Sequence, residues 1–149
     1  MKPFVIFLGL VCLVSGISCK SNEEVNCLDI LSPEFISFKI ADKNTNADLF
    51  FGAQPAYITG ELKIYQHDKL IPFEIKTDAA NGSYFKVQVQ IAYTNAETLQ
   101  LKIADEPLQE LIYTSTTASD PCPRYPVNTV KFNSINYDNV LNRVIVLKK

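Results

Sequence analysis

The sequence predicts an all-β domain, a two-sheet antiparallel β-sandwich of eight or nine short strands in an immunoglobulin-like or transthyretin-like arrangement. The clearest evidence is residues 83–91, where apolar and polar side chains alternate strictly, as in a strand with one buried and one solvated face. Further alternating segments follow at short intervals, and no part of the predicted domain indicates a helix of normal length. One buried face per strand suits two packed sheets, although a closed barrel would satisfy it too.

Residues 1–18 have the features of a secretory signal peptide. Lys2 gives a positive start, and eleven almost uniformly apolar residues run from Phe4 to Val14. That run is shorter than the ~20 residues a bilayer-spanning helix needs, and small residues follow it. We therefore expect residues 1–18 to be absent from the mature protein.

The segment 15–19 resembles a bacterial lipobox, in which the cysteine becomes the first mature residue and carries lipid. Small Ser18 directly precedes Cys19, while Gly16 stands where the family prefers leucine. The segment 20–24 is similar to the lysine-plus-acidic tether that can route Bacteroidetes-type lipoproteins to the cell surface.

The whole chain resembles small Bacteroidetes-type lipoproteins of unknown function, which join a short tether to a single all-β domain. The resemblance implies lipid on Cys19, a lipidated tether over residues 19–27 and one β-sandwich domain over residues 28–149. It also implies a surface-exposed position on the bacterial outer membrane and a binding or accessory role. Contact with the membrane would be made through the lipid anchor, and two or more acyl chains suffice for that.

Two further cysteines belong to the predicted domain. If Cys19 carries lipid, Cys27 and Cys122 are the pair left in an oxidising compartment, and we expect a disulfide between them. It would join the start of the domain to a proline-rich loop; two free thiols are the alternative.

The first strands follow from alternation. Residues 35–40 predict a strand with Ile36, Phe38 and Ile40 inward, and a polar turn separates it from a short second strand over residues 49–51. Leu62 and Ile64 then face inward on the next strand, and Ile71, Phe73 and Ile75 face inward on the strand after it.

The hairpin registers follow from keeping apolar residues on one face. A four-residue loop over residues 67–70 would set Ile64 opposite Phe73. For the next turn, a three-residue loop with a left-handed Gly82 pairs Ile75 with Val87, whereas a two-residue loop would mix the two faces.

The remaining chain predicts a strand over residues 98–104, a short helical turn over residues 105–110, and strands over residues 111–117, 129–135 and 143–147. We expect an ordinary solvated outer face without aromatic side chains. Its expected members are Glu74, Lys76, Lys86, Gln88, Gln90, Gln100 and Lys102.

One loop has the oxygen spacing of a calcium site. Asp42, Asn44, Asn46 and Asp48 stand at alternate positions, as calcium-loop ligands do. Ala47, however, occupies the position where such loops need glycine, and the distal glutamate is missing. Asp and Asn are also frequent in plain turns, so a turn without metal is the favoured interpretation.

Neither catalysis nor nucleic-acid binding is predicted. The single histidine, His67, stands beside Asp68 in an expected turn, and no catalytic triad or zinc cluster can be assembled around it. The net charge of -2 gives no basic surface for nucleic acid. We expect no cofactor; a small secreted hydrolase or hydrolase inhibitor is the alternative class.

The favoured hypothesis is a non-catalytic binding or structural module of the cell envelope, with a glycan, a peptide or an envelope protein as partner. Tyr57, His67 and Tyr125 fall in expected loops, where recognition residues commonly sit on a rigid scaffold. We expect the contact surface in loops at one end of the sandwich rather than on a sheet face.

Overall fold

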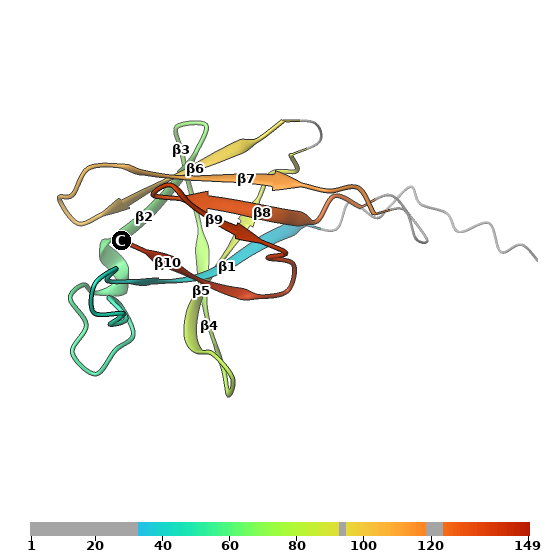
Figure 1. The fold of residues 1–149 in the computed structure, drawn as a ribbon. Helices are drawn as coiled ribbons and strands as arrows, with labels where there is room; N and C mark the ends of the chain where they lie inside the picture. The colour runs from blue at the N-terminus through green and yellow to red at the C-terminus, as the bar shows by residue number, and fades with distance from the viewer. Residues whose placement is uncertain (1–32, 93–94, 119–123) are drawn as a thin grey trace, which may run out of the picture.

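The computed structural model describes residues 33–92, 95–118 and 124–149, and in these ranges two sheets pack face to face as a sandwich (Figure 1). The four-stranded sheet has the order β10 (Val144–Lys148), β1 (Glu34–Ala41), β5 (Gly82–Val89), β4 (Phe73–Asp78). The six-stranded sheet has the order β3 (Lys69–Ile71), β2 (Leu62–Gln66), β6 (Glu97–Ile103), β7 (Gln109–Ser115), β8 (Val127–Phe132), β9 (Ile135–Asp138). The predicted all-β sandwich is confirmed, with ten strands in the described residues where eight or nine were expected.

Alternation correctly assigned the buried face of the central strands. Ile36, Phe38 and Ile40 of β1 are buried, as are Phe85 and Val87 of β5. β1 pairs antiparallel with β5 and parallel with β10, so the four-stranded sheet is mixed. The parallel pair joins the first and last strands of the described domain, which no hairpin connects.

The segment predicted as one strand around residues 71–75 is two strands in different sheets. Pro72 separates β3 from β4 and supplies no N–H to a ladder, and the chain crosses there between the two sheets. The preceding turn has two residues, His67 and Asp68, both left-handed with φ of 49° and 60°. Ile64 consequently lies opposite Ile71, and the predicted partner was wrong.

The β4–β5 hairpin keeps the predicted faces but not the predicted register. Gly82 is left-handed, with φ of 65°, as expected. Ile75 pairs with Phe85 instead of Val87, a shift of two residues that leaves every side chain on its face. The side chain of Asp78 accepts hydrogen bonds from the N–H groups of Ala80 and Asn81, and this closes the loop one residue earlier than expected.

Residues 49–51 form a turn rather than the predicted short strand. The carboxylate of Asp48 accepts hydrogen bonds from the N–H groups of Phe50 (3.0 Å) and Phe51 (2.9 Å). Gly52 permits the close return of the chain, because a Cβ atom there would meet the Asp48 carbonyl oxygen at 2.9 Å. The turn directs Phe50 and Phe51 onto Phe85. Residues 105–110, predicted as a short helical turn, form a non-helical connection over residues 105–108 and then the start of β7.

A buried polar group joins the two sheets. Tyr113 of β7 donates a hydrogen bond to the carbonyl of Gln90, which follows β5, and accepts one from Gln66 Nε2, both at 2.7 Å. Burial raises the pKa of Tyr113 to about 12, so the phenol stays neutral and available as a donor.

We predict that Tyr113→Phe lowers the free energy of unfolding by ~1–3 kcal/mol, because it leaves the buried Gln66 amide and Gln90 carbonyl without their partner. Urea titration measures the change. Tyr65→Phe is the matched control, since that hydroxyl has no hydrogen bond to a described residue and its loss should cost less than ~0.5 kcal/mol. Equal costs for the two variants would contradict this role of Tyr113.

Candidate functional site

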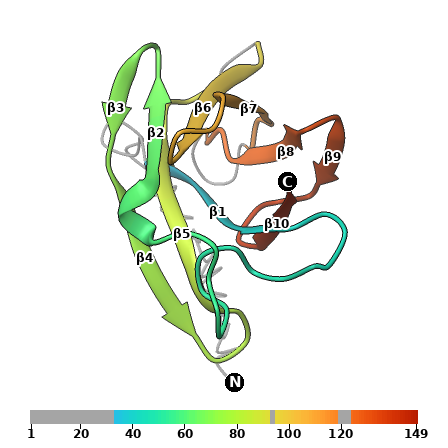
Figure 2. The same cartoon turned by 90° about the vertical axis from the view of Figure 1, so that its left-hand side faces the viewer.

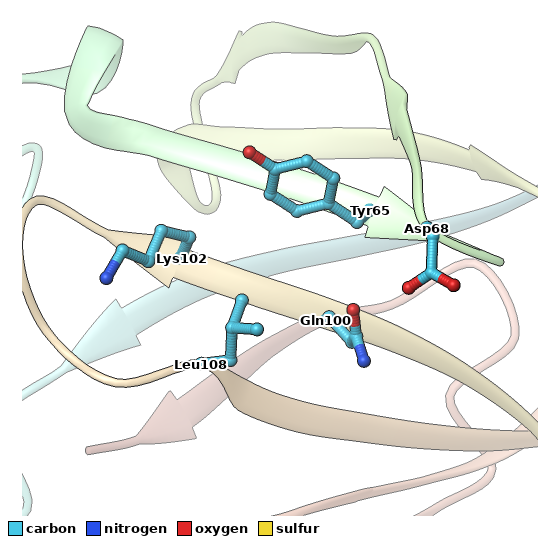
Figure 3. Close-up of a pocket in the computed structure, with 5 residues that line it drawn as sticks. All are labelled: Tyr65, Asp68, Gln100, Lys102 and Leu108. Carbon is cyan, nitrogen blue, oxygen red and sulfur yellow. The ribbon is translucent and has the colours of Figure 1, made fainter.

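A hollow of about 370 Å³ lies on the outer face of the six-stranded sheet (Figure 3). We call it the Tyr65 hollow. Its lining residues come from β2, the β2–β3 turn, β6 and the segment before β7: Tyr65, Asp68, Gln100, Lys102 and Leu108.

The strand registers bring these side chains together. Tyr65 lies opposite Gln100 on β6, and on its other side it lies opposite Leu70 on β3. Because directly paired residues share a face, all three point away from the core. Leu70 and Leu108 are 62% and 53% exposed, so the phenol ring stands between two apolar side chains open to solvent.

The expectation of an outer face without aromatic side chains was therefore wrong. Alternation with buried Leu62 and Ile64 already directs the Tyr65 ring outward, and the expected members of that face did not include it. The four-residue loop expected over residues 67–70 would also have removed Leu70 from the sheet. The two-residue turn places Leu70 opposite Tyr65. The sequence did contain a signal, because His and Asp are among the residues that tolerate positive φ.

Polar groups surround this apolar surface. Within the described residues neither the Asp68 carboxylate nor the Gln100 amide has a hydrogen-bond partner. Lys102 Nζ, by contrast, donates to the backbone carbonyl of Glu106. One acid and one amide beside the ring are thus without a partner among the described residues.

A second hollow of about 370 Å³ shares Leu108 with the first and continues across β7 and β8; we call it the Lys131 hollow. Its other lining residues are Gln109, Glu110, Ile112, Lys131, Asn133 and Ser134. Gln109 Oε1 is buried and has no hydrogen-bond partner among the described residues. The two hollows together extend across four neighbouring strands.

A third hollow, of about 260 Å³, lies on the outer face of the four-stranded sheet. Phe35 and Tyr84 contribute aromatic rings to it, and Lys86 Nζ lies 4.1 Å from the centre of the Phe35 ring. Burial raises the pKa of Glu34 at its border. Acidic and basic groups alternate around this hollow, so its charge favours neither sign of ligand.

Two of the three predicted loop residues lie at opposite ends of the six-stranded sheet. β2 runs antiparallel to β6, with Gln66 opposite Leu99, and His67 follows at that end. Tyr57 hydrogen bonds to Glu106, which lies beyond the other end of β6. The expectation that these loops share one end was wrong for Tyr57.

Tyr125 lies at the same end as His67 but not beside it. β8 begins at Val127, opposite Ser115 at the end of β7, level with the start of β6. His67 Nε2 lies 3.0 Å from Glu97 Oε2 at that start. Three strand spacings, ~14 Å, separate β2 from β8. Tyr125 is partly buried, whereas His67 adjoins Asp68 and so borders the Tyr65 hollow.

Tyr57 is engaged in a contact that fastens the C-terminus. Its hydroxyl donates to Glu106, and Glu106 also forms an ion pair with Lys149, the last residue. Lys149 Nζ lies 5.1 Å from the centre of the Tyr57 ring. The hydrogen bonds from Lys149 and Tyr57 lower the pKa of Glu106. Tyr57 thus has a structural role in this fold.

The calcium candidates form a hydrogen-bonded turn. Asp42 Oδ1 accepts hydrogen bonds from the N–H groups of Asn44 (2.9 Å) and Thr45 (2.7 Å) and from the Thr45 hydroxyl. These bonds, chiefly those from Thr45, lower the pKa of Asp42.

Lysine ammonium groups lie where a metal ion would have to bind. Asn46 Oδ1 accepts a hydrogen bond from Lys148 Nζ at 2.6 Å, and Asp48 Oδ2 lies 3.6 Å from Lys39 Nζ. The oxygens of this loop therefore do not fit a calcium site. In the described ranges, no group of three or more His, Cys, Asp or Glu side chains is placed to hold a metal ion.

Comparisons with protein-family models, with curated proteins and with solved structures found no match. The leader over residues 1–18, the lipidation candidate Cys19 and the disulfide candidates Cys27 and Cys122 lie outside the described residues. Within the described residues, no helix is long and apolar enough to cross a membrane.

We predict that Glu106→Gln lowers stability at neutral pH and flattens its pH dependence. A carboxyl whose pKa is lowered by folding stabilises the folded state above its ordinary value of 4.5, and this stabilisation is lost as the pH falls through the folded pKa. For a partly exposed ion pair we expect less than ~1 kcal/mol.

Thermal melting from neutral pH to below 4.5 tests this prediction. The control is Glu110→Gln, because Glu110 is exposed and has no ion-pair partner among the described residues. Identical pH profiles for wild type and Glu106→Gln would show that the contact adds no stability.

Proposed function

We propose that this chain is a lipid-anchored, non-catalytic binding module of the bacterial cell envelope, and that the Tyr65 hollow binds a glycan. One observation carries the proposal: the partly exposed ring of Tyr65 lies beside exposed Leu70 and shares its hollow with exposed Leu108, and the Asp68 and Gln100 groups that also line the hollow have no partner among the described residues. An aromatic ring offers apolar area to the C–H face of a sugar, and nearby carboxylate and amide groups can bind its hydroxyls.

The chemistry of the hollow favours binding over hydrolysis. A glycosidase needs two carboxyl groups on either side of the scissile bond, and Asp68 is the one carboxylate among the residues that line the Tyr65 hollow. The Lys131 hollow would extend the contact to further sugar units of a chain. In this proposal the glycan contacts the outer face of the six-stranded sheet, and His67 borders that contact.

We further propose that Cys19 carries lipid and holds the module at the surface of the outer membrane. The lipobox-like segment 15–19 supports this, and the tether over residues 19–27 would separate the domain from the bilayer. Two or more acyl chains give stable anchoring, so the sheet faces are left for ligand.

A disulfide between Cys27 and Cys122 is the third part of the proposal. Glu34 accepts a backbone hydrogen bond from Val127 and is attracted by Arg124, which follows Cys122 by two positions. Glu34 and Arg124, described residues close in sequence to the two cysteines, therefore lie near each other. Glu34 follows Cys27 by seven positions, a distance along the chain that can span up to ~24 Å.

Intact-mass spectrometry of the protein extracted from cells tests the anchor and the disulfide together. We predict a chain that begins at a lipid-modified Cys19 and takes up no thiol reagent when denatured without reductant. An unmodified Cys19 or a retained Met1 would refute the anchor, and two reactive thiols would refute the disulfide.

We predict that Tyr65→Ala weakens glycan binding about tenfold, a loss of ~1.4 kcal/mol, with an unchanged melting temperature. A glycan array followed by titration of the best-bound glycan measures it. Tyr125→Ala is the control, because it tests the loops as the alternative contact surface. Loss of binding in Tyr125→Ala alone would move the site to the loops, and turnover of the glycan would overturn the non-catalytic assignment.

A further inference from the structure

β4 leaves one side of the four-stranded sheet open. It stands last in the strand order, with β5 on one side, and Figure 2 shows it at the border of the molecule. Five of its six residues are exposed. Every second residue of such a strand turns its N–H and C=O groups away from the sheet, where another strand can pair with them.

The other border strands of the described fold are less suited to pairing. β3 has three residues and β9 has four. β10 has five residues and is engaged at its C-terminal end, where the Lys148 N–H donates to the hydroxyl of Tyr137 and its carbonyl accepts a hydrogen bond from Asn133. β4 is therefore the longest open border strand in the described ranges.

We propose that β4 pairs antiparallel with β4 of a second copy of this chain, about a two-fold axis at Ile75. In this register Glu74 of each copy lies opposite Lys76 of the other, twice by symmetry. Both side chains are on the outer face, and they already form an ion pair within one copy, with 2.7 Å between Lys76 Nζ and Glu74 Oε2. The dimer would join the four charges into one alternating ladder.

The charge pattern selects this register over its neighbours. A shift of two residues is the smallest that keeps every side chain on its face. One such shift sets Glu74 opposite Glu74, and the other sets Lys76 opposite Lys76 and Glu74 opposite Asp78. Directly opposed like charges are destabilising, so the register centred on Ile75 is the complementary one.

Apolar contact supports the same register. Ile75 lies on the inner face beside Phe85, yet the described residues leave it 47% exposed. The two-fold axis would bring Ile75 against Ile75 and remove both from water. Pairing would extend from Phe73 to Thr77 and end at Pro72, which has no N–H to donate.

Opposite charge variants test the proposal. Lys76→Glu makes β4 acidic and Glu74→Lys makes it basic, so each variant alone places like charges opposite each other. We expect analytical ultracentrifugation of the whole protein in detergent to show a concentration-dependent wild-type dimer. Each variant should raise the dimer Kd about tenfold or more. An equimolar mixture should form a heterodimer, because its charges are complementary again.

Lys69→Glu on border strand β3 is the matched control and should dimerise as wild type does. A monomeric wild type at every concentration would overturn the proposal, as would undiminished dimers of both variants. Thermal melting checks that both variants are folded. If they are folded and their mixture still does not restore dimers, the association uses another surface. Recovery in the mixture also shows that neither variant lost association through misfolding.

Discussion

The fold depends on the packing of four aromatic rings around Phe85. This side chain is fully buried at the centre of β5, and the rings around it are Phe38, Phe50, Phe51 and Phe73, with centroid distances of 4.8–5.7 Å. Rings that meet edge-on or tilted at such distances add to the stabilisation that burial alone gives. Two of these rings come from neighbouring strands, β1 and β4, and two come from the turn after Asp48. One side chain therefore fastens a long connection to the sheet.

This packing extends to the C-terminus. Phe50 also contacts Tyr57, with 5.6 Å between ring centroids, and Tyr57 binds Glu106 and Lys149. The loop before β2, the connection after β6 and the end of β10 are thereby held together at one end of the sandwich. The surfaces left unengaged are elsewhere: the outer face of the six-stranded sheet and the open side of β4.

The period of two in the sequence was sufficient to assign faces, because burial alone decides which side of a strand is apolar. It did not determine registers, which depend on turn conformation. The left-handed His67 and Asp68 and the side-chain hydrogen bonds of Asp78 set the two hairpins, and Pro72 moved the chain between sheets. The apolar neighbour of Tyr65 was missed for the same reason, since Leu70 is paired with Tyr65 only through the two-residue turn. The sequence favoured loop residues as the contact surface instead, and one of them, Tyr57, holds the C-terminus through Glu106 and Lys149.

The two unengaged surfaces lie on different sheets, and this separation has a consequence for binding. A dimer through β4 would continue the four-stranded sheet and leave the outer face of each six-stranded sheet uncovered. Both Tyr65 hollows could then meet the same repeating glycan. The second contact would be intramolecular, so overall affinity could exceed that of one hollow by ~100-fold or more where the spacing of sugar units matches. Single-site stacking is weak, and a dimer of shallow hollows would compensate for it without a deep pocket.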